Sequence, residues 1–167
     1  MNVALVALGS NLGARRDTLE AAFTALEALP DTRCVAQSRL HETDPEECPA
    51  GAGAFLNAAA LLHTELDPHA LLAELQRVEA EHGRERIEHN GPRTLDLDLV
   101  LHGTHVLHDP SLQLPHPRAH TRLFVLEPAA EIAPDLQHPV LGRDLASLRD
   151  ELRAKTPRAA ATKLVES

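Results

Sequence analysis

Two carboxylates in an apolar stretch are the residues of this sequence best suited to chemistry. Asp96 and Asp98 interrupt a run of Leu and Val within residues 89–101, HNGPRTLDLDLVL. In a strand, side chains two positions apart point to the same face, about 7 Å from each other. A buried pair of like charges is costly unless something positive lies between them. The pattern therefore predicts a site for a hard cation such as Mg²⁺ together with a polyphosphate.

The alternative is an edge strand whose carboxylates simply face water, since Asp-x-Asp on its own is a common pattern. Here the Gly91-Pro92-Arg93 turn leads directly into the strand, and leucines flank both aspartates. These two features favour the metal site.

Arginines gather around the carboxylate strand. Arg84, Arg86 and Arg93 lie close together, and Arg118 and Arg122 follow further along the chain. Guanidinium groups bind phosphate oxygens through two parallel hydrogen bonds. We expect Arg93, held by the Gly-Pro turn, to contact phosphate. For Arg86, a weak surface ion pair with a neighbouring glutamate is an equally good explanation.

Aromatic residues are scarce: the chain has three Phe and no Trp or Tyr. Phe55 lies near Asn57, and Phe124 lies near Arg122. Two rings could enclose a flat heterocycle while Asn57 reads its hydrogen-bonding edge. Plain packing in the core is the alternative, and the residues alone favour it.

Eleven histidines raise the question of zinc. His102, His105 and His108 are spaced three apart, but the spacing crosses an expected turn at Gly103 and no cysteine joins them. We predict that they form no structural zinc site. His116 is different, because two prolines flank it and hold it in a rigid turn.

The composition narrows the class of protein. With 167 residues, the chain is long enough for one domain with a substantial core. Its formal net charge of −9 argues against a nucleic-acid-binding protein. We expect no signal peptide, and no apolar run is long enough to span a membrane. Cys34 and Cys48 are the only cysteines, so we expect reduced thiols in a cytoplasmic protein.

Hydrophobic periodicity predicts strands at 2–8, 33–42 and 55–64, in addition to the carboxylate strand. One helix is expected to begin at a capping box at 17–20, and a second to run from the cap Asp67 to about His82. A terminal helix is expected near 143–154. Turns are expected at 9–13 and at 103–104, the latter a hairpin turn. The β-α-β-β-α-β order predicts an α+β, ferredoxin-like sandwich with an antiparallel sheet. Residues 1–155 are expected to form one catalytic domain, and 156–167 a flexible tail.

With these residues in view, the chain resembles the 6-hydroxymethyl-7,8-dihydropterin pyrophosphokinase (HPPK) family of folate biosynthesis from Val3 to about Pro134. The resemblance is carried by residues 89–100, HNGPRTLDLDLV, supported in order and spacing by ALGSNL at 7–12, FLNAA at 55–59 and LPHP at 114–117.

The resemblance implies transfer of pyrophosphate from ATP to the pterin hydroxymethyl oxygen, with release of AMP. It also implies that Asp96 and Asp98 bind two Mg²⁺ ions and act in catalysis with Arg84 and Arg93. The expected partners are these small molecules alone, with no nucleic acid or membrane, and the protein is expected to be a monomer. The implied ATP contacts are Gln76, Glu79, Arg84, Arg86, Arg93, Leu99, His116 and Arg122; the implied pterin contacts are Thr43, Asp44, Pro45, Phe55, Asn57 and Phe124.

The chain departs from the family pattern at several positions. Asn90 stands where relatives carry Trp, Pro117 where Tyr is frequent, Asp44 where Pro is usual, and Ser111 and Gln113 where Arg and Thr contact ATP in some members. These changes bear on nucleotide affinity and on closure of the polar loop at 84–91, which we expect to act as a lid over ATP.

Two other classes remain open from the sequence. Gly9-Ser10 with Asp96-Leu97-Asp98 also resembles the paired motifs of Mg²⁺-dependent nucleotidyltransferases, although those motifs lie close together in such enzymes and far apart here. A non-catalytic ferredoxin-like binding module is the second alternative. The nucleotide product separates the first from a pyrophosphokinase, and failure to bind Mg²⁺-ATP would favour the second.

Overall fold

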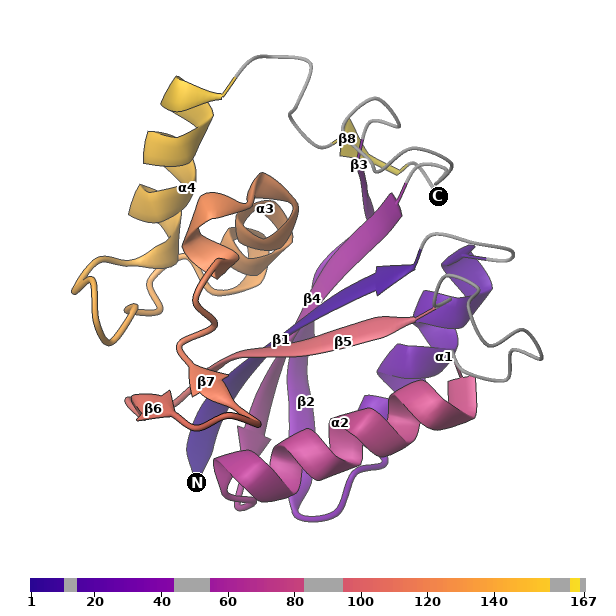
Figure 1. Cartoon of the computed structure of the whole chain (residues 1–167). Coiled ribbons are helices and arrows are strands. Elements are labelled where there is room, and N and C mark those ends of the chain that lie inside the picture. The colour runs from indigo at the N-terminus through magenta and orange to yellow at the C-terminus, as the bar shows by residue number, and fades with distance from the viewer. Residues whose placement is uncertain (11–14, 44–54, 83–94, 157–162, 166–167) are drawn as a thin grey trace.

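An antiparallel sheet forms the centre of the protein in a computed structural model that describes residues 1–10, 15–43, 55–82, 95–156 and 163–165 (Figure 1). Its strands lie in the order β5-β1-β4-β3-β8, and β2 also pairs with β4. The strands are β1 (Asn2–Ser10), β2 (Thr32–Gln37), β3 (His41–Thr43), β4 (Phe55–Thr64), β5 (Asp96–His102) and β8 (Lys163–Leu164).

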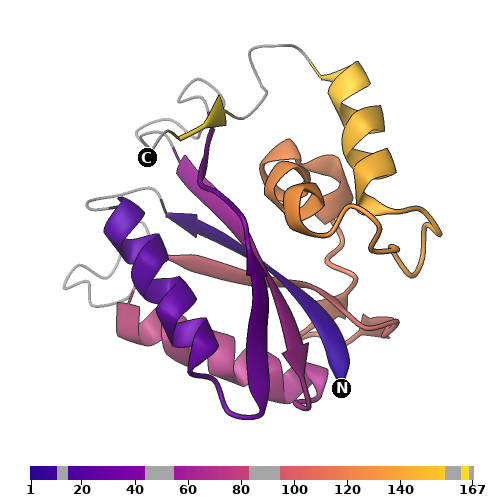
Figure 2. The same cartoon turned by 180° about the vertical axis from the view of Figure 1, so that it is seen from behind.

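Helices cover both faces of this sheet, as Figures 1 and 2 show from opposite sides. Helices α1 (Arg15–Glu27) and α2 (Pro68–His82) lie on one face, and α3 (Leu123–Ile132) and α4 (Leu145–Lys155) lie on the other. The core accordingly has two parts, one under each pair of helices. The three layers follow from β1 and β4, which are apolar on both faces and so need cover on both sides.

Side-chain alternation assigns each residue of β1 to a layer. Ala4, Val6 and Leu8 pack under α1 and α2, while Leu5 and Ala7 belong to the layer of α3 and α4. Strand β5 changes this alternation once. Leu99 pairs with Val6 but Leu101 pairs with Leu5, so Val100 is an extra residue, a β-bulge.

The ferredoxin-like α+β fold expected from the sequence is confirmed, including the antiparallel pairing. The strand at 55–64 has the predicted limits. Helix α2 begins after Asp67 as predicted, because the Asp67 carboxylate accepts a hydrogen bond from the Ala70 amide at 2.8 Å.

Several local predictions need correction. The prediction that a turn starts at Gly9 is wrong, because Gly9 and Ser10 are the last residues of β1, which lies between β4 and β5. The capping box is wrong, since α1 begins at Arg15 and Asp17 lies inside its first turn. A carboxylate there is favoured by the positive end of the helix, so the same sequence pattern fits either position.

The strand expected at 33–42 is two strands, β2 and β3, which pair one after the other with β4. Between them Ser38 contacts β4 through its amide, which donates to the Ala59 oxygen, and through its hydroxyl, which accepts from the Ala59 amide. A side-chain hydrogen bond here replaces one rung of the regular ladder, so the strand is interrupted.

The hairpin expected at Gly103 is also different. The chain turns there, but β6 (Leu107–His108) pairs with β7 (Gln113–Leu114) and not with β5. The outer edge of β5 is instead contacted by His116, whose amide donates to the Val100 oxygen at 2.9 Å.

Part of the tail expected to be flexible is paired. Lys163 and Leu164 form β8 along the outer edge of β3, and the Val165 amide donates to the Leu40 oxygen at 2.9 Å. An uncovered strand edge would leave its amides and carbonyls without partners. From the sequence we also expect loops at 43–54 and 84–92 and Gly83 as the cap of α2. Thr43 instead belongs to β3, and residues 44–54 and 83–94 lie outside the described residues. None of the helices described is long and apolar enough to cross a bilayer.

Candidate active site

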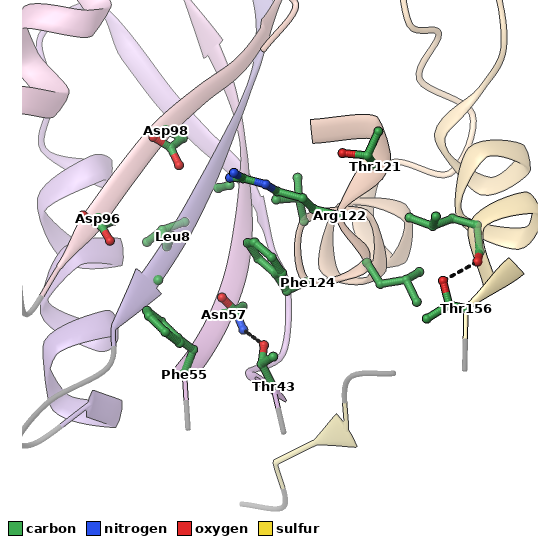
Figure 3. Close-up of a pocket in the computed structure, with 15 residues that line it drawn as sticks. Leu8, Thr43, Phe55, Asn57, Asp96, Asp98, Thr121, Arg122, Phe124 and Thr156 are labelled. Carbon is green, nitrogen blue, oxygen red and sulfur yellow. Dashed lines mark hydrogen bonds between the residues drawn. The ribbon is translucent and has the colours of Figure 1, made fainter. Parts of the chain in front are cut away.

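A cavity of about 500 Å³ opens between the sheet and α3, which is a size typical of small-molecule sites (Figure 3). The sheet supplies one wall, and the 3₁₀ turn at Ala119–Thr121 with α3 and the end of α4 supplies the other. The sheet contributes Ala7, Leu8, Gly9, Thr43, Phe55, Asn57, Asp96 and Asp98; the helical side contributes Thr121, Arg122, Leu123, Phe124, Val125, Leu152 and Thr156.

Strand pairing places both carboxylates in this cavity. Asp96 lies opposite Gly9 of β1, which in turn lies opposite Asn57 of β4, so the three form one row across the sheet. Asp98 lies opposite Ala7 in the next row. The prediction that the two aspartates share a face is confirmed, since both line the cavity. Their neighbours in β1 are small, so the floor between the strands stays open.

Asn57 is buried and oriented by a hydrogen bond. Its side-chain amide nitrogen donates to the Thr43 hydroxyl at 2.5 Å, a contact drawn in Figure 3. The carbonyl oxygen of the same side chain points toward Gly9. A Cβ atom placed on Gly9 would lie 3.5 Å from this oxygen. Asn57 therefore presents an acceptor to the cavity, which suits a ligand edge that carries N–H donors.

The two phenylalanines line the cavity and belong to neither part of the apolar core. Phe55 projects from β4 and Phe124 from α3, and Phe124 is 36% exposed. Packing in the core, which the residues alone favoured, is therefore wrong for this pair. The Arg122 guanidinium carbon lies 5.5 Å from the centre of the Phe124 ring, a cation–π arrangement, and the side chain extends toward Asp98 in Figure 3.

His116 lies beside the carboxylate strand with one ring nitrogen already engaged. The Arg118 amide donates to its Nδ1 at 3.2 Å, so the neutral ring carries its proton on Nε2. Burial lowers the pKa of His116, and this effect outweighs the opposing effect of Asp98; the charges of Arg122 and Arg118 lower the pKa further. The free protein at neutral pH therefore holds a neutral imidazole here.

Several predicted site residues do not line the cavity, and His116 is one of them. Gln76 is exposed on α2, and Leu99 is packed in the core under α1 and α2. Glu79 is buried, and its carboxylate accepts a hydrogen bond from the Leu97 amide at 2.8 Å, between the two aspartates of β5. The remaining predicted residues, Asp44, Pro45, Arg84, Arg86 and Arg93, and the lid at 84–91 lie outside the described residues.

Sequence reasoning missed the part of the cavity formed by α4. Leu152 and Thr156 line it, and the Thr156 hydroxyl donates to the Leu152 oxygen at 2.6 Å. No motif marks these residues, and they reach the site only because α4 packs against α3. Glu127 of α3 and Arg153 of α4 form an ion pair between the two helices, with 2.5 Å between the carboxylate oxygen and the guanidinium nitrogen.

The three histidines considered for zinc are not arranged alike. His102 is buried, its Nε2 lies 2.9 Å from the Leu66 oxygen, and its Nδ1 lies 3.2 Å from Nδ1 of His105. His108 lies exposed on β6. Across the described ranges, no group of three or more His, Cys, Asp or Glu residues is arranged to hold a metal ion. The absence of structural zinc stays a prediction.

These features define an α+β protein with a small-molecule site in which paired carboxylates lie near an amide acceptor and two aromatic rings. A family model described as 7,8-dihydro-6-hydroxymethylpterin-pyrophosphokinase (HPPK) matches residues 5–134. This chain belongs to the HPPK family.

Two bacterial relatives illustrate the similarity in sequence. The 2-amino-4-hydroxy-6-hydroxymethyldihydropteridine pyrophosphokinase of Pseudomonas aeruginosa is 49% identical over 143 residues, which cover 86% of this chain and 87% of that protein. The enzyme of the same name from Haemophilus influenzae is 42% identical over 139 residues, which cover 83% of this chain and 86% of that protein.

Solved structures agree in fold. The wild-type HPPK-DHPS of Plasmodium falciparum with pteroate has a TM-score of 0.72 at 14% identity, covering 92% of this chain and 43% of that one. The same protein with STZ-DHP has a TM-score of 0.76 at 12% identity, covering 99% and 47%. The chain thus spans less than half the length of these solved proteins, and at such low identity the likeness concerns the fold alone.

The lowered pKa of His116 makes a testable prediction about charge. Titration of the ring followed by NMR should give a pKa below the ordinary 6.5. Asp98→Asn should lower the pKa further, because the carboxylate is the one group named here that raises it. An anionic ligand beside the ring should raise the pKa of His116, so the affinity for such a ligand should increase as pH falls from the pKa of the bound state to that of the free protein. His116→Gln assigns the signal, and a pKa at or above 6.5 in the free protein contradicts the prediction.

Proposed function

We propose that this chain transfers the pyrophosphoryl group of ATP to the hydroxymethyl oxygen of 6-hydroxymethyl-7,8-dihydropterin, releasing AMP, as a step of folate biosynthesis. The observation that carries the proposal is the shared cavity. Asp96 and Asp98 face the same space as Asn57, Phe55 and Phe124. One end therefore suits cations and phosphate, and the other suits a flat heterocycle.

At the heterocycle end, each residue has a distinct role. The rings of Phe55 and Phe124 offer faces for stacking on the pterin. The Asn57 carbonyl oxygen accepts from the N–H groups on the pterin edge, while its amide nitrogen remains bonded to Thr43. Asp44 and Pro45 are proposed as further pterin contacts. Gly9 lies between Asn57 and Asp96, which leaves space for the hydroxymethyl arm to reach the carboxylates.

At the phosphate end, Asp96 and Asp98 would hold two Mg²⁺ ions. The donor set fits, because carboxylate oxygens suit hard cations, and Mg²⁺ is usually held by one or two carboxylates with substrate phosphates and water. When bound, the ions supply neutralisation of phosphate charge and alignment of the reacting groups.

Basic residues would complete the phosphate end. Arg122 extends over the cavity, and the Nε2 proton of His116 is available to donate to a phosphate oxygen. We propose Arg84, Arg86 and Arg93 as further phosphate contacts, with Arg84 and Arg93 acting in catalysis. We also propose Gln76, Glu79 and Leu99 as nucleotide contacts. None of the three lines the cavity, so these contacts would lie outside it.

Catalysis by these residues is mainly positioning. The pterin hydroxyl is a weak nucleophile, so stacking and the Asn57 contact must hold it in line with the β-phosphorus. Charge develops on the phosphate oxygens as the bond to the α,β-bridging oxygen breaks and AMP leaves. Arg122, together with the other proposed phosphate contacts, would stabilise that charge, and exclusion of water would strengthen the effect.

We also propose the wider setting of the protein. Residues 1–155 act as a single catalytic domain, with small molecules as the only partners. The chain works as a monomer in the cytoplasm, and the segment 84–91 closes over ATP as a lid. The net charge of −9 supports the absence of nucleic acid among the partners.

The reaction is tested by separating the products formed from ATP, Mg²⁺ and 6-hydroxymethyl-7,8-dihydropterin. We expect AMP and the pterin pyrophosphate, and no AMP when either Mg²⁺ or the reduced pterin is omitted. Released pyrophosphate would indicate nucleotidyl transfer, and ADP would indicate transfer of a single phosphoryl group. Failure to bind Mg²⁺-ATP would favour a binding module.

Replacing either carboxylate should remove most of the activity. Asp96→Ala and Asp98→Ala should each lower turnover by at least about 100-fold through loss of cation positioning. The fold should survive, since each change also removes a repelling charge. Asp135→Ala, an exposed aspartate after α3, is the matched control and should leave turnover unchanged. Near-full activity of either site variant at low Mg²⁺ would exclude the two-cation arrangement.

Removing the exposed ring should weaken binding of one substrate selectively. Phe124→Ala should weaken pterin binding by about 1–3 kcal/mol, because stacking and burial are lost, and should change ATP binding far less. Separate titrations with each ligand measure this. Equal losses for both ligands, together with a lowered melting temperature, would mean that the ring serves the fold instead.

A further inference from the structure

We propose that His41 and Glu131 form a positioning pair that fixes the spacing between β3 and α3, and thereby the fit of the flat heterocycle in the cavity. Neither side chain lines the cavity itself. The inference deepens the proposed function, because it concerns the pterin end of the same site.

Three contacts join Glu131 to the segment around β3. His41 Nε2 lies 2.8 Å from one Glu131 carboxylate oxygen. The other oxygen accepts from the Arg39 amide at 2.9 Å and from the Arg39 side chain at 3.3 Å. The His41 side chain is only 9% exposed and that of Glu131 21% exposed, so the contact between these two is shielded from water, whereas the Arg39 side chain is 66% exposed. A hydrogen-bonded pair with little exposure to water holds its geometry better than a pair on the surface.

The position of His41 links this contact to pterin recognition. His41 lies directly opposite Asn57 in the pairing of β3 with β4. Thr43, two residues further along the same face, holds the Asn57 amide. A shift of β3 would therefore move Thr43 and change the direction in which the Asn57 oxygen points.

The position of Glu131 links the same contact to the opposite wall. Glu131 lies in the last turn of α3, the helix that follows Arg122 and carries Phe124 near its start. Because a helix moves as a rigid body, fixing its end also limits where the Phe124 ring lies over the sheet. The pair thus ties together the side chains on both sides of the heterocycle.

A glutamate in the last turn of α3 is unfavourable unless its carboxylate has partners, as Glu131 has in Arg39 and His41. Burial alone would raise the pKa of its carboxyl group, yet the hydrogen bonds from Arg39 and His41 bring the pKa below its ordinary value. The last turn of α3 carries no basic residue, and a negative charge there opposes the helix dipole. The contacts with Arg39 and His41 compensate for both costs.

The sheet holds the other end of the pair in place. β3 has three residues and lies between β4 and β8, with Leu164 opposite His41. Paired on both edges, β3 is a fixed support against which Glu131 can position α3.

A double-mutant cycle tests the proposal. The variants are His41→Ala, Glu131→Gln and their combination, with Glu74→Gln as the control for a partly exposed glutamate ion pair on the far layer. Binding of 6-hydroxymethylpterin is followed by its own fluorescence, which the protein does not obscure because it has no Trp or Tyr. KM for the reduced pterin and for ATP, and the melting temperature, are measured on the same proteins.

We expect each single change to weaken pterin binding about five- to tenfold while KM for ATP stays within about twofold, and the double variant to be little worse than either single variant. His41→Gln should restore much of the affinity, because its amide can donate to Glu131. The Glu74→Gln control should match the wild type.

Three results would overturn the pair. These are unchanged pterin binding in both single variants, losses that add fully in the double variant, or equal rises in both KM values together with a lower melting temperature. The last would mean that the contact serves only the fold. The proposed function is judged separately, by whether the wild type makes AMP. If the wild type binds pterin but makes no AMP, the proposed reaction is wrong. The double-mutant cycle for pterin binding would still test the His41–Glu131 pair.

Discussion

Antiparallel pairing of β1 with β4 on one side and with β5 on the other is the constraint on which the site depends. Backbone hydrogen bonds fix which residues share a row, and the pleat fixes which rows face α3. Asp96, Gly9, Asn57 and His41 belong to one such row across four strands. A shift of one residue in any of these pairings would turn a polar side chain into the apolar layer under α1 and α2.

The layer on the cavity side combines two kinds of surface. Near the ends of β1, β4 and β5 that carry Gly9, Asn57 and Asp96, the sheet is polar and covered only loosely. Further along, Leu5 and Ala59 are buried under α3 and α4. α3 spans both regions, so the same helix that closes the core also carries Arg122 and Phe124 over the cavity. Stability and ligand binding therefore depend on the same packing.

How far the sequence could predict this arrangement depends on the range of the interaction. The limits of β4 and the start of α2 were predictable, because alternation and a capping aspartate are local signals. The shared face of the aspartates followed from strand periodicity. The split between β2 and β3 was not predictable, because it depends on Ser38 meeting Ala59 of another strand. The contribution of Leu152 and Thr156 depends on how α4 docks, which no local pattern specifies.

The bulge at Val100 lets one short strand serve both surfaces. Without an extra residue, alternation would place His102 in the same layer as Asp98 and send Leu101 to the opposite one. With it, Leu101 joins the core beneath α3, and His102 turns inward to meet the Leu66 oxygen. The number of residues between Asp98 and Leu101 therefore decides which side chains face each layer. Substitutions of similar size can be absorbed there, whereas loss of one residue would force either the carboxylates or the apolar anchor to change sides.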